Sequence, residues 1–134
     1  MAKLIEVEGI GEAYAQKLGT AGIKTLAGLL KKGGTPEGRK DIAAKSGVSD
    51  ALILEWVNHA DLFRIKGIGS EYADLLEEAG VDTVVELSKR NAENLATKVA
   101  QINTEKKLVR RVPSLKQVTH WIEEAKTLQR AVSY

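Results

Sequence analysis

The sequence predicts an all-α protein built from two similar helical units, and three observations support this fold class. The apolar residues are mainly Ala, Leu, Ile and Val, without sustained alternation of period two, which favours helices over strands. The chain repeats itself with an offset of 58 residues. Thr, Ser and Asn residues stand directly before apolar segments, where they are typical helix N-caps.

The repeat is clearest around a Gly-Ile-Gly sequence in each half. The two copies are EVEGIGEAYAQKLGTAG, with Gly9, Ile10 and Gly11, and RIKGIGSEYADLLEEAG, with Gly67, Ile68 and Gly69. A second match places Trp56 in EWVNHA and Trp121 in HWIEEA, now with an offset of 65. The second copy therefore has about seven additional residues before its last helix.

The duplication also predicts the domain organisation. We expect a first unit over residues 1–61 and a second unit over residues 62–134, each with four to five short helices. No Gly-, Ser- or Pro-rich segment separates the two copies. We therefore expect the two units to pack as one compact body.

In the first unit, a short apolar helix precedes Gly-Ile-Gly and a second helix follows it directly. Thr25 is placed to cap the next helix. Thr35 precedes Pro36, which is favoured at the first helical position because its missing N–H would have no partner there. Ser49 opens the helix that carries Trp56.

In the second unit, the same helix follows Gly-Ile-Gly, and the cap candidates after it are Thr83, Asn91, Thr104 and Ser114. Thr83 and Ser114 are each followed three residues later by Glu or Gln, which is the pattern of a capping box. These positions predict the helix starts of the second unit.

The Gly-Ile-Gly sequence has a physical logic of its own. The first glycine permits the positive φ of a tight turn, and the isoleucine can pack inward between two helices. The second glycine leaves the start of the next helix without a covering side chain, so its N–H groups and the positive end of the helix dipole face outward. Such a surface binds phosphate oxygens.

Both copies match Gly, an apolar residue, Gly, three residues, Ala, two residues and Leu, with the last two positions filled by Ala15 and Leu18, and by Ala73 and Leu76. This pattern resembles the helix-hairpin-helix superfamily. With EWVNHADLFRIKGIG and KKLVRRVPSLKQVTHWIEEAK, the tandem form closely resembles an uncharacterised bacterial family of small two-repeat helix-hairpin-helix proteins. The resemblance implies two helix-hairpin-helix (SAM-like) units.

The resemblance also implies two classes of function. Many members of the superfamily bind the DNA backbone through the hairpin without reading sequence, and some hold a monovalent cation on hairpin carbonyl groups. Other members use the hairpin for protein contacts. No other cofactor is expected.

The charges beside the two hairpins differ. Glu6, Glu8 and Glu12 flank the first hairpin and would repel a phosphate. Arg64, Lys66 and Ser70 stand at the same positions of the second hairpin. The second hairpin is therefore the predicted phosphate site.

A basic cluster in the additional segment of the second unit extends this prediction. Lys106, Lys107, Arg110 and Arg111 form two i,i+4 pairs, which would share one face of a helix and form a phosphate-facing patch. The same pattern also fits a solvated charged face.

The repeated Tyr14 and Tyr72 could stack on a nucleotide or contact a partner, but we expect each ring to pack on the neighbouring helix. Trp56 and Trp121 are expected to anchor the cores. If the hairpins serve protein contacts instead, the surface would comprise Gly9, Ile10, Gly11, Tyr14 and Tyr72.

Several function classes are excluded. The chain has no cysteine, so it has no disulfide and no thiolate chemistry. His59 and His120 are far apart, and no set of residues has metal-ligand, nucleophile-elbow or phosphate-loop spacing. We therefore expect neither an enzyme nor a small-molecule substrate nor a metal. No segment has the length and apolarity of a membrane span or leader, so we expect a cytoplasmic protein without a membrane partner.

The sequence thus predicts a non-enzymatic module that binds nucleic acid weakly through backbone phosphates, independently of base sequence. Its net charge is only +2. The excess of positive charge lies after residue 62, where the sequence has twelve basic and ten acidic residues. The predicted contact residues are Arg64, Lys66, Gly67, Ile68, Gly69, Ser70, Lys106, Lys107, Arg110 and Arg111. The alternative is a protein-interaction adaptor with no nucleic-acid role.

Overall fold

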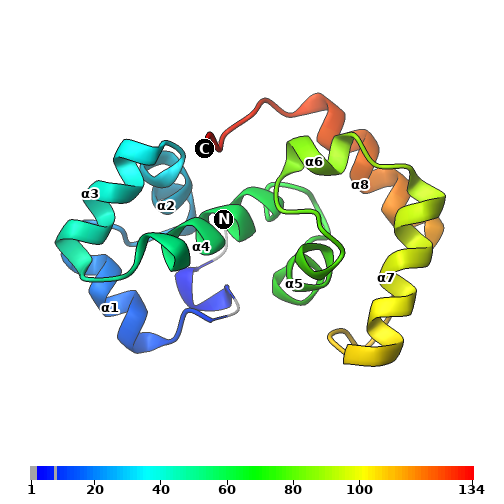
Figure 1. Cartoon of the computed structure of the whole chain (residues 1–134), viewed down its shortest axis with the longest axis horizontal. Helices are drawn as coiled ribbons and strands as arrows, with labels where there is room; N and C mark the ends of the chain where they lie inside the picture. The colour runs from blue at the N-terminus through cyan, green and yellow to red at the C-terminus, as the bar shows by residue number, and fades with distance from the viewer. Residues whose placement is uncertain (1–2, 8) are drawn as a thin grey trace. The chain divides into compact units, whose positions relative to one another are not determined.

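The computed structural model describes residues 3–7 and 9–134. Over these residues the chain forms eight α-helices and one short 3-10 helix, and it forms no strand (Figure 1). The all-α prediction is confirmed. Among the described residues, no helix combines the length and the apolar character that crossing a membrane would require.

The chain divides into two structural units. The first comprises Met1–Asp61 together with Ala131–Tyr134, and the second comprises Leu62–Arg130. The sequence had assigned residues 131–134 to the second unit, and this assignment is wrong for those four residues. They pack instead on the first unit, because the main-chain N–H of Ser133 donates a hydrogen bond to the carbonyl of Gly34 (2.8 Å).

The elements that begin in the first unit are η1 (Leu4–Glu6), α1 (Glu12–Thr20), α2 (Leu26–Gly33), α3 (Pro36–Ser46) and α4 (Asp50–Leu62). Helix α3 packs against both α1 and α2, and η1 packs against α1. Trp56 of α4 is 1% exposed, which confirms it as a core residue. The aliphatic side chains of Leu18, Leu26, Leu29, Ile42 and Ile53 in the same unit are also fully buried.

The predicted caps of the first unit are confirmed. The Thr25 hydroxyl accepts a hydrogen bond from the N–H of Gly28 (2.9 Å), and the Thr35 hydroxyl accepts one from Gly38 (3.1 Å). The Ser49 hydroxyl accepts a longer hydrogen bond (3.3 Å) from the N–H of Leu52 in the first turn of α4. Each bond satisfies an N–H group that the helix itself leaves unbonded.

An ion-pair network joins α2 to α3. The Asp41 carboxylate lies 2.7 Å from Lys32 Nζ and 3.1 Å from Lys45 Nζ. Hydrogen bonds from these two ammonium groups lower the pKa of Asp41 below its ordinary value. All three side chains are about half exposed, so the network makes a small contribution to stability.

The helices of the second unit are α5 (Ser70–Glu78), α6 (Val84–Ser88), α7 (Ala92–Lys106) and α8 (Leu115–Thr127). Helix α8 packs against α6 and α7, and α7 also packs against α5. Their shared core includes Leu76, Leu87, Leu95, Val99 and Trp121. Trp121 is 4% exposed, so the second tryptophan is also a core residue, as predicted.

The two capping boxes of the second unit have different outcomes. Ser114 and Gln117 exchange reciprocal hydrogen bonds of 3.1 and 3.0 Å, so this box is confirmed. Thr83 accepts a bond from the N–H of Glu86 (3.3 Å), but the Glu86 carboxylate accepts from Asp82 (3.4 Å) and not from Thr83. Thr83 is therefore a cap without the second half of the box.

Asn91 caps α7 as predicted, through a 3.0 Å hydrogen bond from the N–H of Asn94. Thr104 does not begin a helix, so this prediction is wrong. It lies inside the 15-residue α7, and its hydroxyl donates to the carbonyl of Ala100 (3.0 Å). No glycine or proline interrupts residues 92–106, and one continuous helix forms there.

Candidate nucleic-acid interface

The first glycine of each Gly-Ile-Gly turn has the positive φ that the sequence predicted. Gly9 has φ 94° and Gly67 has φ 92°. A Cβ atom on either glycine would also lie 3.4 Å from Nε1 of the core tryptophan of its own unit, Trp56 or Trp121. The backbone angle favours glycine at these two positions, whereas a Cβ at this distance would make an ordinary van der Waals contact.

The isoleucine and the second glycine also occupy their predicted places. Ile10 and Ile68 are 3% and 4% exposed and pack inward. Gly11 and Gly69 are the N-cap residues of α1 and α5, with extended backbone. A Cβ atom on either would meet nothing within 4 Å among the described residues. Neither helix start has a side-chain cap, and the space beside each N-cap glycine is open.

Each repeated tyrosine packs against the tryptophan of its own unit. The ring centroids of Tyr14 and Trp56 are 5.0 Å apart, and those of Tyr72 and Trp121 are 5.1 Å apart, with tilted planes in both pairs. These distances are typical of edge-to-face aromatic pairs. The expectation that the rings pack on a neighbouring helix is confirmed.

The second turn is joined to part of the basic cluster. A hollow of about 390 Å³ is lined by Gly67, Gly69, Ser70, Glu71, Tyr72, Arg110 and Arg111. The Tyr72 hydroxyl donates a 2.9 Å hydrogen bond to the carbonyl of Arg111, which holds the arginine segment beside the start of α5. Both arginines are exposed. Two cationic side chains and a helix N-terminus without a cap therefore share one hollow.

The helical face expected for the basic cluster does not form, so that prediction is wrong. Helix α7 ends at Lys106, and Lys107 has left-handed backbone with φ 53°. The reason is a side-chain contact: the amide of Asn103 accepts from the N–H of Val109 (2.9 Å) and donates to its carbonyl (3.1 Å). Val109 is buried, and the chain turns back after α7 to place it in the core.

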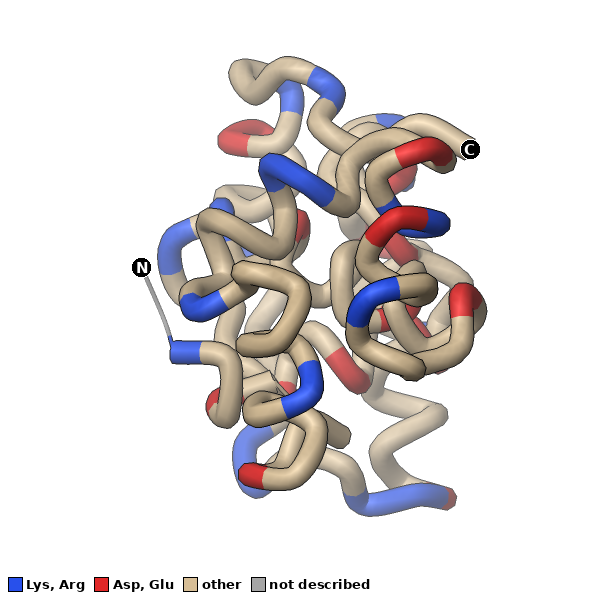
Figure 2. Tube along the Cα trace, turned by 90° about the vertical axis from the view of Figure 1, so that its left-hand side faces the viewer, with Lys and Arg blue, Asp and Glu red and all other residues tan. Residues whose placement is uncertain are grey.

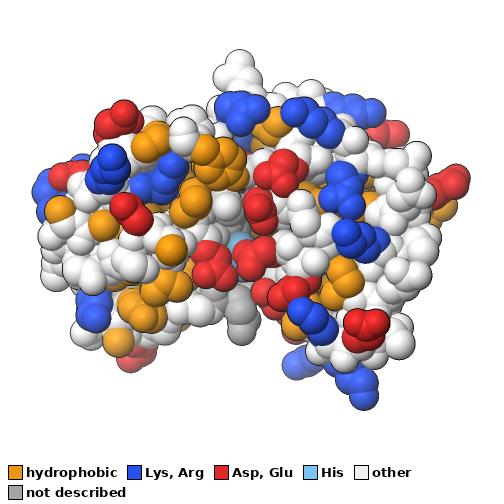
Figure 3. Space-filling view, viewed as in Figure 1, with side chains coloured by type: hydrophobic (Ala, Val, Ile, Leu, Met, Phe, Trp, Pro, Cys, Tyr) orange, Lys and Arg blue, Asp and Glu red, His pale blue; other side chains and the backbone are white. Residues whose placement is uncertain are grey.

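The turn after α7 separates the four basic residues. Lys106 donates to Glu78 at the last residue of α5 (2.7 Å), and this hydrogen bond raises the pKa of Lys106. Nine helical residues span about 13 Å, so this ion pair lies at the opposite end of α5 from the hollow. Lys107 is exposed beside it. Figure 3 shows Lys and Arg side chains gathered around the end of α7.

The residues before the second turn have an acidic neighbour that the sequence did not reveal. Lys66 is exposed, but its main-chain N–H donates to the carboxylate of Glu124 in α8 (3.4 Å). Arg64 is half-buried. Glu71 also lines the hollow. Two carboxylates therefore reduce the positive potential near the turn.

The first turn has the acidic surroundings that were predicted. The carboxylate of Glu6 accepts from the main-chain N–H of Lys3, and Glu12 is exposed at the first residue of α1. Glu8 lies outside the described residues. Along the described part of the Cα trace, basic positions are interspersed with acidic ones (Figure 2).

Another hollow, of about 630 Å³, lies in the first unit, and the sequence did not predict it. It is lined by Lys3, Leu4, Ile5, Glu12, Ala15, Gln16, Gly19, Ile23 and Lys24. Ile5 stands beside it with 54% of its surface exposed, which is large for an isoleucine. The signal in the sequence was the pair of small residues Ala15 and Gly19, which lie four apart on α1 and leave the helix surface low.

Comparison with known proteins gives one match. A search of curated proteins and a search of solved structures each found nothing similar to this chain. One family model, described as a domain of unknown function, matches residues 8–128, which include both turns and all eight α-helices. The chain therefore belongs to the DUF4332 family.

Proposed function

We propose that this chain is a tandem helix-hairpin-helix module that binds nucleic acid weakly through backbone phosphates at the second Gly-Ile-Gly turn. One observation carries the proposal: Arg110 and Arg111 line the same hollow as Gly69 and Ser70 at the N-terminus of α5. Phosphate oxygens accept hydrogen bonds both from the N–H groups of such a helix end and from guanidinium groups.

The surroundings of the turn set the strength and the specificity. Glu71 and Glu124 oppose the two arginines, so we expect weak binding. Lys106 is paired with Glu78 at the far end of α5 and is left out of the interface. With about two or three phosphates contacted, the logarithmic salt slope should be about −2 to −3. Backbone contacts of this kind do not distinguish base sequence.

The first turn is a poor phosphate site although its backbone has the same form. Helix α1 also begins after a glycine N-cap, Gly11, which provides no side-chain cap. However, Glu6 and Glu12 bring carboxylates to this turn, and they oppose the dipole of α1 for an anionic ligand. The proposal assigns the binding role to the second unit for this reason.

A charge-reversal pair tests the proposal. The double variant Arg110→Glu and Arg111→Glu should abolish binding of a duplex DNA oligonucleotide in a fluorescence-anisotropy titration at low salt. The matched control is Lys98→Glu with Lys116→Glu, which makes the same charge change at two exposed positions of the same unit. The control should lose affinity only modestly, through long-range charge.

A protein-interaction adaptor is the second candidate, and the hollow beside Ile5 in the first unit favours it. No binding of DNA at tens of micromolar, or equal losses in the two double variants, would leave the adaptor as the better proposal. Neither candidate involves an enzymatic step. A monovalent cation on the carbonyl groups of the turn and a cytoplasmic location stay predictions.

A further inference from the structure

The last four residues of the sequence, Ala131–Tyr134, occupy a groove in the first unit that none of the functions above uses. The main-chain N–H and the hydroxyl of Ser133 both donate to the carbonyl of Gly34, at 2.8 and 3.2 Å. Val132 is 1% exposed. We call these four residues the tail, and the surface that holds them the tail groove, which includes Gly34, Arg39 and Asn58.

Arg39 supplies the main polar contact of the tail groove. Its guanidinium donates to the carbonyl of Gly33 (2.9 Å) and to the carbonyl of Ser133 in the tail (2.7 Å). The residue is only 6% exposed. A buried charge is destabilising unless hydrogen bonds compensate it. The carbonyl of Ser133 in the tail is one of the two acceptors that compensate this charge.

Gly34 makes room for the tail. A Cβ atom at this position would lie 2.4 Å from the carbonyl oxygen of Ala131, which is far inside van der Waals contact. The backbone of Gly34 is ordinary right-handed helical, with φ −67°. Glycine is therefore needed here for the close approach of the tail and not for a special backbone angle.

The groove recognises the tail mostly through its main chain. The N–H and the carbonyl of Ser133 both have partners, while the side chains add the buried Val132 and a 3.4 Å bond from the Tyr134 hydroxyl to Asn58. These contacts do not depend on which copy of the chain delivers the tail.

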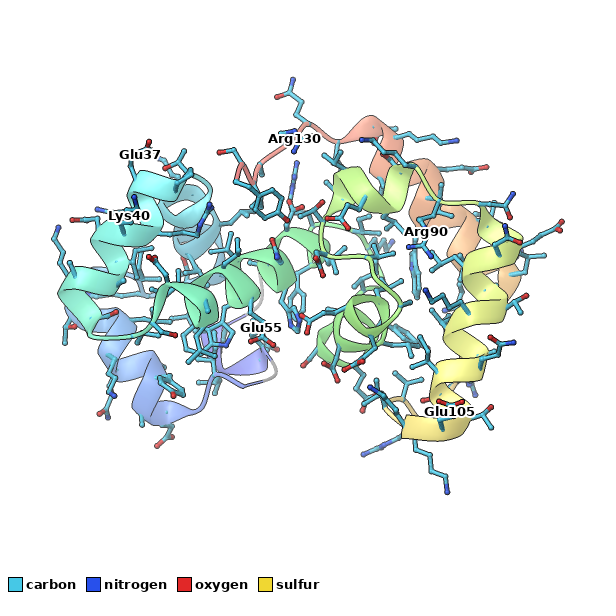
Figure 4. The ribbon with its side chains drawn as sticks, viewed as in Figure 1. Glu37, Lys40, Glu55, Arg90, Glu105 and Arg130 are labelled. Carbon is cyan, nitrogen blue, oxygen red and sulfur yellow. The ribbon has the colours of Figure 1, made fainter. Side chains whose placement is uncertain are left out.

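The connection to the tail would allow the tail groove to bind either the tail of its own chain or the tail of a second copy. Helix α8 ends at Thr127, and its C-cap Leu128 is extended with φ −95° and ψ 144°. Residues 129–134 have no regular secondary structure, and Arg130 lies on this segment (Figure 4). A short segment without regular secondary structure, held on a surface by a few hydrogen bonds and one buried side chain, is a geometry that allows exchange between copies.

We infer that the tail groove is a docking site for the tail of a second copy of this chain, so that two copies can associate by exchanging tails. The tail of the same chain competes with the tail of a second copy for the groove. Because it is tethered by a short connection, its effective concentration at the groove is about 1 mM. Because the own tail is docked in the single chain, the dissociation constant for a tail from a second copy lies below about 1 mM.

Complementation between two variants tests this inference without competition from the own tail. The acceptor lacks residues 131–134 and keeps Arg39. The donor keeps the tail and carries Arg39→Met, which removes the guanidinium but retains an unbranched side chain of similar length. Since the sequence has no cysteine, Lys98→Cys on the exposed surface of α7 allows each variant to be labelled with one dye. Association is then measured by energy transfer and by sedimentation velocity.

Each variant alone should be monomeric, and the mixture should form a one-to-one complex with half-saturation below about 1 mM. The acceptor should also melt at a higher temperature when the donor is present, because its Arg39 regains an acceptor. A donor with the additional change Val132→Asp should bind at least tenfold more weakly, since it places a carboxylate in an apolar position.

Gly34→Ala is a second donor, used in case Arg39→Met does not fold. It blocks the groove sterically and leaves the buried charge in place. Absence of a complex at 1 mM with both folded donors would overturn the inference, and so would equal binding by the Val132→Asp donor. Loss of DNA binding in the arginine pair of the second unit is independent of these outcomes, because those variants leave the tail groove unchanged.

Discussion

Gly69→Asp should make the protein more stable and the proposed phosphate site inactive. Gly69 is the N-cap of α5, with φ −107° and ψ −163°, which is the extended backbone that N-cap residues adopt. A Cβ there meets nothing within 4 Å among the described residues. The new carboxylate can therefore accept from N–H groups in the first turn of α5, which has no side-chain cap, without strain.

The two effects have opposite signs and can be estimated separately. Replacing a glycine cap by aspartate contributes a few tenths of a kcal/mol, and its charge at the helix N-terminus adds about 0.3–1 kcal/mol. For a chain of this size the melting temperature should rise by about 2–5 °C. The same carboxylate occupies the N–H groups and repels phosphate, so DNA affinity should fall at least tenfold, or about 1.4 kcal/mol.

Gly11→Asp is the matched control. Gly11 caps α1 with φ −88° and ψ −177°, and a Cβ at this position also meets nothing within 4 Å of the described structure. It should raise the melting temperature by a similar amount and leave DNA binding nearly unchanged. Circular dichroism measures the melting and fluorescence anisotropy the binding. Unchanged binding by a stabilised Gly69→Asp would refute the site, and an equal loss in Gly11→Asp would move it to the first turn.

Two further predictions concern the segment after α7 and the α2–α3 ion pairs. Asn103→Ala removes both hydrogen bonds to Val109; unfolding should become easier by about 1–3 kcal/mol in urea denaturation, and DNA affinity should fall because Arg110 and Arg111 are no longer held beside α5. Asp41 has a pKa below its ordinary 3.8 in the folded protein, so its stabilising effect is present above that pH and disappears as the pH falls through the folded value. The melting temperature of Asp41→Asn should therefore lie below that of the wild type near neutral pH, and the two should converge in strong acid.

The two Gly-Ile-Gly turns show which structural features the local sequence predicts. The positive φ of Gly67, the burial of Ile68 and the uncapped start of α5 all depend on residues within one turn of the chain. The same is true of the caps at Thr25, Asn91 and Ser114, whose partners lie three residues away. Short-range sterics and hydrogen bonds decide such features, so the sequence alone predicted them.

The pattern of charged residues was a less reliable guide to which side chains share a surface, because it does not show where a helix ends. The i,i+4 spacing of Lys106 and Arg110 predicted one basic face, but the Asn103 amide binds Val109 and the chain turns back. Arg90, on the α6–α7 connection, also contacts a segment distant in sequence (Figure 4). Its guanidinium donates a hydrogen bond to the carbonyl of Ala79 at the end of α5 (3.4 Å).

The sequence by itself determined the helical class, the duplication, the turn glycines and most helix starts, since each depends on periodicity or on neighbours within one turn. The tertiary structure alone decided which distant groups meet. It placed Arg111 beside Tyr72, the carboxylate of Glu124 beside Lys66, and the tail on Arg39. These pairs are separated by 39, 58 and 94 residues, and contacts over such distances follow from the packing of whole helices, which no local pattern encodes.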